Sequence, residues 1–378
     1  MMKKVILVGV SHPFRGGLAS YNERLIEEFN KYGDETEIVT FTLQYPKFLF
    51  PGKTQYSSSP KPSHLKISER VNSINPLNWL KVGRQLKKEQ PDLLILKYWL
   101  PFMGPCLGTI ARIVKKNKHT KVICVIDNII PHEKRPGDKI FTKYFVKPVD
   151  AFVAMSKSVL SDLKQFNVDK PALFSPHPIF DNFGEKISRE DALERLGLNS
   201  DQNYVLFFGI IRDYKGLDLL LQAFSNDQFP ELNVKLIVAG EFYANEQTYI
   251  DLIKELKLEE HVILINEFIA NEDVKNYFCA ADILAQPYKT ATQSGVTQIG
   301  YHFEKPMLVT DVGGLSEIIP HDKAGYVVQP NPSDIRNALL DFFQNSRKAE
   351  MTQNICIEKE KYSWDKMVNT VNHLFDKI

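Results

Sequence analysis

The sequence predicts an α/β protein with two doubly wound parallel sheets, one after the other along the chain. Three observations support this prediction. The chain has 378 residues, more than a single hydrophobic core usually serves. Short, continuously apolar or β-branched runs alternate with segments of helical spacing, as in parallel sheets buried on both faces. This alternation occurs twice, in halves of similar length, so we expect two βα domains.

The first half opens with an apolar run that fits a strand. The strands expected in this half lie at 5–10, 37–41, 93–97, 122–126 and 151–155. Residues 18–33 have the apolar spacing of an amphipathic helix that ends at Gly33. Residues 42–78 are rich in Pro, Ser, Tyr and Phe and show no clear period, so we interpret them as a long loop region.

The second half repeats the pattern. Its expected strands lie at 204–210, 234–240, 261–268, 282–288, 306–311 and 325–329, with helices at 216–224 and 247–258. Pro and Gly punctuate a change from basic to acidic composition within 174–197. We therefore expect one domain over 1–178 and another over 179–360, followed by an amphipathic helix at about 361–378.

Composition indicates a soluble globular protein, with 43% hydrophobic and 25% charged residues. The net charge of +1 hides an asymmetry. Residues 1–180 carry 28 Lys and Arg against 15 Asp and Glu, a net +13, whereas the remainder carries 19 against 31, a net −12. A basic half of this kind suggests an anionic surface or partner. We do not expect nucleic acid, because no aromatic and basic binding motif accompanies the charge.

The sequence also indicates where the protein is located and how its cysteines behave. The first apolar run leads into His12-Pro13 without a small-residue cleavage site, which favours a strand over a signal peptide. No apolar stretch approaches the ~20 residues of a membrane span. The four cysteines are scattered, with no close pairs and no close His spacing, which argues against a disulfide framework or a zinc site. We therefore expect a cytoplasmic protein with inert thiols.

Two loops follow expected strands and precede helices, where ligands bind in open α/β sheets. In the first, the adjacent glycines Gly16 and Gly17 let the backbone approach a ligand, and amides at a helix start favour phosphate. A tight turn that merely needs glycine is an equally good interpretation. In the second, Gly209 ends a strand, and Arg212 and Lys215 precede a helix. Two cations at a helix N-terminus suit a diphosphate.

The chain resembles a known family in several segments, which occur in the family's order and cover most of the sequence. These segments are RGGLASYNERL, FFGIIRDYKGLDLLLQAF, LIVAGEF, ADILAQPY and KPMLVTDVGGLSEII. They are similar to the motifs of the retaining glycosyltransferases of family 4. The resemblance implies the GT-B fold, in which two doubly wound, Rossmann-like domains face a central cleft. It further implies a nucleotide-sugar donor held by the second domain, an acceptor held by the first, and a C-terminal helix that packs back on the first domain.

The resemblance also implies roles for individual residues. Arg212 and Lys215 would neutralise the leaving diphosphate. The donor cradle would comprise Gly16, Gly17, Gly209, Gln293, Ser294, Gly295, Val296 and Thr297. Gln298 would bind the ribose, and Glu267 and Phe268, which end the expected strand at 261–268, would lie beside the base. The family usually has two glutamates eight positions apart here, where this chain has Thr290 and Gln298.

The acceptor side differs from the family as well. Related enzymes usually place a histidine just after the fourth strand of the first domain. This chain has Asp127 and Asn128 at that strand end, and His132 and Glu133 slightly later. We expect Asp127 or His132 to orient an acceptor hydroxyl or to stabilise positive charge at the anomeric carbon, with Asn128, Glu133 and, more weakly, His12 on the same side. A structural hydrogen bond is an equal interpretation for His132. We interpret His177 as structural.

The resemblance implies a hexosyltransferase that needs no cofactor and no metal, because front-face attack lets the departing phosphate oxygen take the acceptor proton. A saccharide or lipid-linked saccharide of a cell-surface polysaccharide is the expected acceptor. The basic segments 79–90 and 111–121 suggest peripheral contact with the inner face of an anionic membrane. Two alternatives stay open: a sugar-nucleotide epimerase or hydrolase, and a non-catalytic nucleotide-sugar binding protein.

Overall fold

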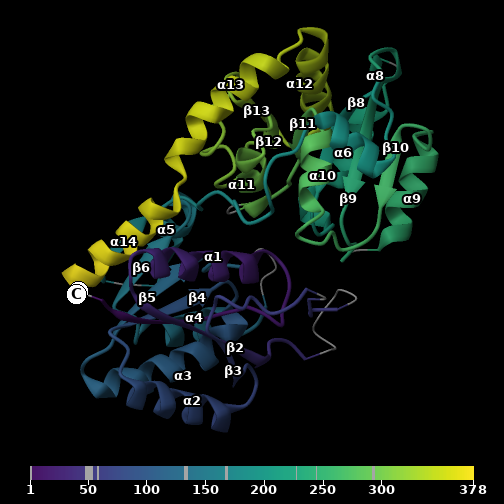
Figure 1. The fold of residues 1–378 in the computed structure, drawn as a ribbon. Helices are drawn as coiled ribbons and strands as arrows, with labels where there is room; N and C mark the ends of the chain where they lie inside the picture. Colours follow the sequence, from purple (N-terminus) through teal and green to yellow (C-terminus); the bar gives the residue numbers. More distant parts are fainter. Residues whose placement is uncertain are drawn as a thin grey trace. The chain divides into compact units, whose positions relative to one another are not determined.

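The structure is a computed structural model that describes residues 2–46, 54–57, 59–131, 135–166, 169–226, 228–243, 245–291 and 294–378. The chain forms two compact units. Unit 1 comprises Met1–Pro178 and Ser363–Ile378, and unit 2 comprises Ile179–Tyr362. Each unit is a parallel sheet flanked by helices (Figure 1). The predicted fold class, with two doubly wound Rossmann-like domains, is confirmed.

In the described part of unit 1, seven parallel strands form one sheet in the order β3-β2-β1-β4-β5-β6-β7. Their bounds are β1 Lys4–Val8, β2 Glu35–Leu43, β3 Ile67–Asn72, β4 Leu93–Tyr98, β5 Lys121–Ile126, β6 Ala151–Ala154 and β7 Ala172–Phe174. Strand β1 pairs with both β2 and β4, so the direction of winding reverses there. Ligands of doubly wound sheets bind beyond the strand ends at such a reversal.

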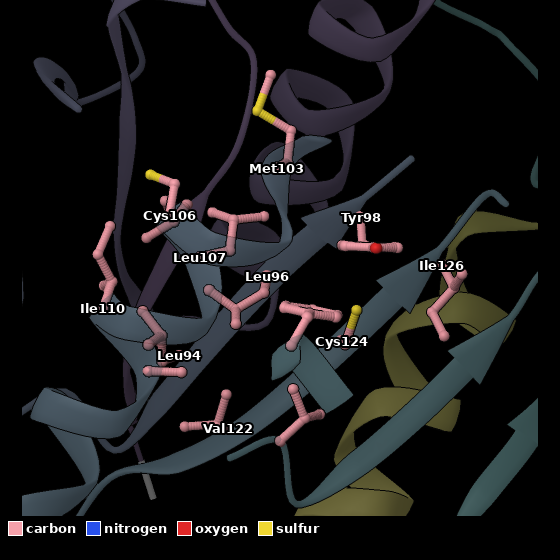
Figure 2. Packing of buried hydrophobic residues seen from close by; sticks show 14 of the residues in the cluster. Leu94, Leu96, Tyr98, Met103, Cys106, Leu107, Ile110, Val122, Cys124 and Ile126 are labelled. Carbon is pink, nitrogen blue, oxygen red and sulfur yellow. The ribbon is translucent and has the colours of Figure 1, made fainter. Parts of the chain in front are cut away.

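Helices cover both faces of this sheet. They are α1 Gly17–Lys31, α2 Pro76–Glu89, α3 Gly104–Val114, α4 Asp138–Val146, α5 Lys157–Lys164 and α14 Trp364–Lys377. Helix α3 lies between α2 and α4, and α1 contacts α14. Figure 2 shows Cys106, Leu107 and Ile110 of α3 packed over alternate residues of β4 and β5, including Leu96 and Cys124. Because side chains alternate along a strand, Lys97 points to the opposite face.

Unit 2 repeats the design. Its described strands form a six-stranded parallel sheet in the order β10-β9-β8-β11-β12-β13. The strands are β8 Asn203–Phe208, β9 Val234–Ala239, β10 Val262–Ile265, β11 Ile283–Gln286, β12 Met307–Thr310 and β13 Gly325–Val328. The helices are α6 Arg189–Leu196, α7 Leu217–Phe224, α8 Gln228–Glu231, α9 Glu246–Glu255, α10 Val274–Ala280, α11 Gly295–His302, α12 Pro332–Gln344 and α13 Lys348–Glu358. Here the winding reverses between β8 and β11.

Several sequence-based predictions about individual elements are wrong. The interval 42–78 contains β3 and the start of α2, so it is not a single loop region. Strand β3 is an edge strand in which only Ile67 and Val71 are buried and polar residues fill the other four positions, which breaks the apolar run used to recognise strands. Because β3 was missed, the strand at 122–126 is the fifth in unit 1 rather than the fourth, and the short strand β7 was missed too. Strand β10 ends at Ile265, two residues before Glu267.

All four cysteines are free thiols, as the sequence analysis expected. Cys106, Cys124 and Cys279 are buried. Burial raises the pKa of the Cys106 and Cys124 thiols, which keeps them protonated and unreactive.

Candidate functional site

The loop between β8 and α7 carries the two predicted cations of unit 2. Gly209, just after β8, has φ +98°, and a single 3-10 turn over Asp213–Lys215 leads into α7 through Gly216, at φ +69°. A Cβ on Gly216 would lie 1.9 Å from the carbonyl oxygen of Pro287. Only glycine fits this turn, because both the backbone angle and the close approach exclude a side chain. The loop is therefore held firmly against the segment that follows β11.

Lys215 is a buried cation with no counter-ion among the described residues. Its side chain is only 8% exposed, and its Nζ lies 5.2 Å from the centroid of the Tyr288 ring. It forms no ion pair and no side-chain hydrogen bond with any described residue. By contrast, Lys289 pairs with Asp213 at 2.8 Å and with Asp218 at 3.0 Å. A buried charge is costly unless something neutralises it, so an anion bound at this position would offset that cost.

Electrostatics agree with that interpretation. Burial, and then the charge of Arg212, holds the pKa of the Lys215 ammonium below its ordinary value. Arg212 is half-buried, with its guanidinium carbon 5.5 Å from the centroid of the Tyr243 ring. Two cations that repel each other across a short loop are both stabilised when a diphosphate lies between or beside them.

The start of α11 lies beside Lys215. Val296 Cγ2 and Lys215 Nζ both lie 3.4 Å from the position that a Cβ on Gly209 would take. The Ser294 hydroxyl is 3.3 Å from the Tyr288 hydroxyl, and burial raises the pKa of Tyr288 to about 12, so that hydroxyl stays neutral. Ser294 forms no side-chain cap on α11, which leaves the first amides of the helix for a ligand.

Two buried polar residues of α11 differ in their bonding. Thr297 is fully buried and bonds to the side chain of Gln286 on β11 at 3.1 Å. Gln298 is also fully buried, yet neither its amide nitrogen nor its amide oxygen has a hydrogen-bond partner among the residues that the structure describes. Such a group costs about 1–3 kcal/mol until it is satisfied. Gln298 is thus prepared to bond a polar ligand group, whereas Thr297 fastens the helix to the sheet. Thr290, the other matched position, is exposed.

Gly295 and the base-side candidates complete this part of unit 2. A Cβ on Gly295 would lie 2.7 Å from the ring of Phe180, so a glycine lets α11 begin close to that aromatic residue. Glu267 is exposed and Phe268 half-buried, both beyond the end of β10. Gln293 lies outside the described residues. The structure therefore brings together Gly209, Lys215, Ser294 and Val296, and does not tie Glu267 or Phe268 to them.

In unit 1, the loop after β1 is organised by a residue that sequence reasoning missed. Glu23 of α1 accepts hydrogen bonds from the Ser11 hydroxyl at 2.7 Å and from the His12 amide at 2.9 Å. Gly16 has φ +100° and offers no side-chain cap, and Gly17 is the first residue of α1. The start of α1 is thereby left uncapped beside an ordered loop, as an anion site requires.

A buried ion pair joins Lys97, within β4, to Asp127, the residue that follows β5. Asp127 is 7% exposed, and its Oδ1 lies 2.9 Å from Nζ of Lys97, which is 1% exposed. The same Nζ lies 3.6 Å from the centroid of the Tyr21 ring of α1. Burial lowers the pKa of Lys97, whereas burial and the charge of Asp127 raise the pKa of Tyr21. Lys97 was missed, although a lysine inside the run Leu93–Tyr98 was a visible signal.

The remaining acceptor-side candidates have different surroundings. His132 and Glu133 lie outside the described residues, and Asn128 is half-buried beside Asp127. His177 is 5% exposed, contacts the Tyr21 ring edge-on at 5.0 Å, and has Nδ1 2.6 Å from the carbonyl oxygen of Pro178. Burial, and then the charge of Lys97, lowers the pKa of His177 to about 3. A neutral, enclosed imidazole of this kind has a structural role.

Neither a metal cluster nor a membrane span is found in the described part of the chain. No group of three or more His, Cys, Asp or Glu side chains there is placed to hold a metal ion. Within the same residues, no helix combines the length and apolar character needed to cross a bilayer.

Two family models match the chain in succession. The model described as Glycosyltransferase Family 4 matches residues 15–175, and the model described as Glycosyl transferases group 1 matches residues 188–359. Together they cover most of the sequence and divide it close to the boundary between the two units.

Curated relatives agree with the family models. An uncharacterized glycosyltransferase of Methanocaldococcus jannaschii is 23% identical over 100% of this chain and 99% of its own length. A D-inositol 3-phosphate glycosyltransferase of Streptomyces scabiei is 26% identical over 58% of this chain and 52% of its own length.

Solved structures share the fold. Sucrose-phosphate synthase from Thermosynechococcus elongatus has a TM-score of 0.78 at 16% identity, covering 99% of this chain and 98% of that one. HepE of Anabaena, solved in complex with UDP-glucose, has a TM-score of 0.74 at 17% identity and covers 100% of both chains.

Proposed function

Because the chain belongs to glycosyltransferase family 4 and is a glycosyltransferase of the GT-B fold, we propose that it transfers a sugar from a nucleotide-diphosphate sugar. The proposed acceptor is a saccharide or a lipid-linked acceptor, and the transfer retains the anomeric configuration. Unit 2 binds the donor and unit 1 binds the acceptor. The enzyme is proposed to need neither a metal nor a cofactor, because fixed cations and amides can stabilise the diphosphate that leaves.

The observation that supports the proposal best is Lys215, a buried cation with no carboxylate partner in the described residues. It lies beside Gly209 and Val296, at the uncapped start of α11. A donor diphosphate placed there receives charge from Lys215 and Arg212 and hydrogen bonds from helix amides. Ser294, Gly295 and Thr297 shape this cradle, and Gln293 is proposed to belong to it.

The proposed reaction balances without an external base. The acceptor hydroxyl oxygen bonds to the anomeric carbon as the bond from that carbon to the β-phosphate oxygen breaks. The acceptor proton passes to the departing phosphate oxygen, so the products are the glycoside and the nucleoside diphosphate. Charge grows on the diphosphate during this step, and Lys215 and Arg212 stabilise it there. Asp127 is proposed to orient the acceptor hydroxyl or to balance positive charge at the anomeric carbon.

Gln298 is proposed to hydrogen-bond the donor's ribose, which would satisfy its buried amide. Uridine nucleotides are the first donors to test, because HepE of Anabaena was solved with UDP-glucose. The acceptor is proposed to belong to cell-surface polysaccharide synthesis at the cytoplasmic face of a membrane. The net charge of +13 on residues 1–180 supports an anionic surface near unit 1.

The experiment that tests the proposal is a thermal-unfolding panel of nucleoside diphosphates and their sugars, followed by product analysis with the best donor. We expect one nucleotide family to stabilise the protein, and sugar transfer to appear only when an acceptor is added. Released or isomerised sugar without acceptor would favour a hydrolase or an epimerase. Stabilisation without any turnover would favour a nucleotide-sugar binding protein, and a flat panel with folded protein would refute the donor site.

A further inference from the structure

The outer face of α4 is apolar although it is exposed to solvent. Ile140 is 71% exposed, Phe141 38% and Tyr144 37%. Residues four apart share a helix face, so Ile140 and Tyr144 form one row along α4, with Phe141 beside it. The face opposite this row is occupied by the buried residues Thr142 and Val146. Large apolar side chains gathered on a solvent-exposed face are unusual and mark an interaction surface.

A row of lysines runs beside this apolar row. Lys139, Lys143 and Lys147 are four residues apart and all exposed. None of them forms an ion pair with any described residue. The two neighbouring helices add to the positive charge, since α2, α3, the turn Lys115–Asn117 and α4 together hold nine Lys and Arg against two Asp and Glu. The apolar row therefore lies in a strongly positive field.

The apolar row is held in place before any partner binds. The Tyr144 hydroxyl bonds to Thr109 of α3 at 2.8 Å, and the Arg112 guanidinium carbon lies 3.6 Å from the centroid of the Tyr144 ring. Helix α4 also packs tightly on the start of α3, because a Cβ on Gly104 would lie 2.6 Å from the carbonyl oxygen of Phe141. A fixed surface loses little conformational entropy on binding.

We propose that α4 lies flat on an anionic lipid surface, with Ile140, Phe141 and Tyr144 entering the interface and Lys139, Lys143 and Lys147 at the level of the headgroups. Parallel apolar and lysine rows on one helix are what an interfacial helix needs. A second copy of the chain would bring like charges together, so a lipid surface is the better fit. The inference deepens the proposed function by naming its partner surface. It also moves the inserting residues away from 79–90 and 111–121, which supply charge only.

The test is co-sedimentation of the full chain with vesicles of equimolar phosphatidylglycerol and phosphatidylcholine, and with vesicles of pure phosphatidylcholine. We expect binding to the first and little to the second. Ile140→Glu should weaken it at least about tenfold, because an isoleucine leaves the interface. Replacing Lys139 and Lys143 by glutamate should weaken it at least about thirtyfold, at about 1 kcal/mol for each lysine charge lost. The matched control is Leu77→Glu, since Leu77 of α2 is 76% exposed on a basic helix.

The outcomes separate this inference from the proposed function, because vesicle binding is measured without donor and nucleotide stabilisation without lipid. Variants that lose vesicle binding but keep the nucleotide effect support the inference and show that the fold is intact. The inference would be overturned if the wild type bound equally well to charged and uncharged vesicles. It would also be overturned if Leu77→Glu abolished vesicle binding and Ile140→Glu did not. A dimer in sedimentation velocity that Ile140→Glu dissociates would assign the face to a second copy and overturn the lipid assignment.

Discussion

Replacing Lys215 by methionine should separate folding stability from donor binding. This lysine is buried and has no counter-ion in the part of the chain that the structure describes, and its pKa is lowered by burial and then by Arg212. Each unit by which a folded-state pKa is depressed corresponds to about 1.4 kcal/mol of penalty for the charged form. Lys215→Met removes that penalty, so its unfolding free energy at neutral pH should equal or exceed that of the wild type.

The sign of the pH dependence follows from the same shift. Because the folded pKa lies below the unfolded value, the penalty is fully present below the folded pKa and vanishes as the pH rises to the unfolded value, about 10.4. Any stability advantage of Lys215→Met should therefore disappear in alkaline solution. Urea unfolding at neutral and alkaline pH measures this difference directly.

Donor binding should respond in the opposite direction. Removing one preorganised charge from a developing anion costs about 2.7–4 kcal/mol, which is a loss of about a hundredfold to a thousandfold in kcat/KM. At a ligand concentration of about 100 Kd the wild type gains about 2.7 kcal/mol of stability. A variant that binds about a hundredfold more weakly gains only about 0.4 kcal/mol at the same concentration.

The matched control is Lys305→Met. Lys305 is also 8% exposed in unit 2, but it donates to the carbonyl oxygens of Cys279 and Ala281. Its removal should leave the nucleotide effect unchanged. The reasoning would be refuted if Lys215→Met kept the full nucleotide effect and turnover, or if it were clearly less stable than the wild type at neutral pH.

Three further predictions follow from buried polar groups. Gln298→Leu should raise the free energy of unfolding by about 1–3 kcal/mol, because it removes an unsatisfied buried amide. It should also weaken nucleotide binding about tenfold, and unchanged binding would exclude a contact between Gln298 and the donor. Lys97→Met should lower the free energy of unfolding in urea by about 3–5 kcal/mol, because it removes the lysine that pairs with the buried Asp127. Adding Asp127→Leu should restore most of that free energy, and a double variant as unstable as the single one would contradict the importance of the pair. The pKa of about 3 keeps His177 neutral in the folded protein, so this residue should cost the wild type about 2 kcal/mol of stability between about pH 7 and about pH 5. His177→Gln should lack that loss, and an identical acid profile would contradict the assignment.

The fold was predictable because the buried strands of both sheets are almost uninterrupted apolar runs. Strand β5, with the sequence KVICVI, is such a run, so the sequence alone indicates a buried strand there. Strand β3, ISERVN, is not such a run, because its four half-buried or exposed positions carry Ser, Glu, Arg and Asn, so that this edge strand looks like a loop in the sequence. Strand β7 has three residues, which is too short for any pattern to emerge.

The candidate site was predictable where it depends on local spacing and unpredictable where it depends on tertiary contacts. Gly209, Arg212 and Lys215 lie within seven consecutive residues of one loop, so the sequence alone groups them. The partnership of Lys97 and Asp127 joins residues from two neighbouring strands, and register decides it. Whether a buried group has a partner is likewise a property of packing, so the unsatisfied amide of Gln298 could not be read from the chain.

Helix α14 gives unit 1 an unusual order of assembly. This helix packs on α1 and buries Trp364, Met367, Val368, Val371 and Leu374 within unit 1, yet the chain reaches it only after the whole of unit 2. During synthesis, the apolar surface of unit 1 that α14 will cover therefore stays exposed while residues 179–362 are made. Unit 2 is continuous and can complete its own fold during that interval. We therefore expect the first-made half to be prone to aggregation until residues 363–378 are added.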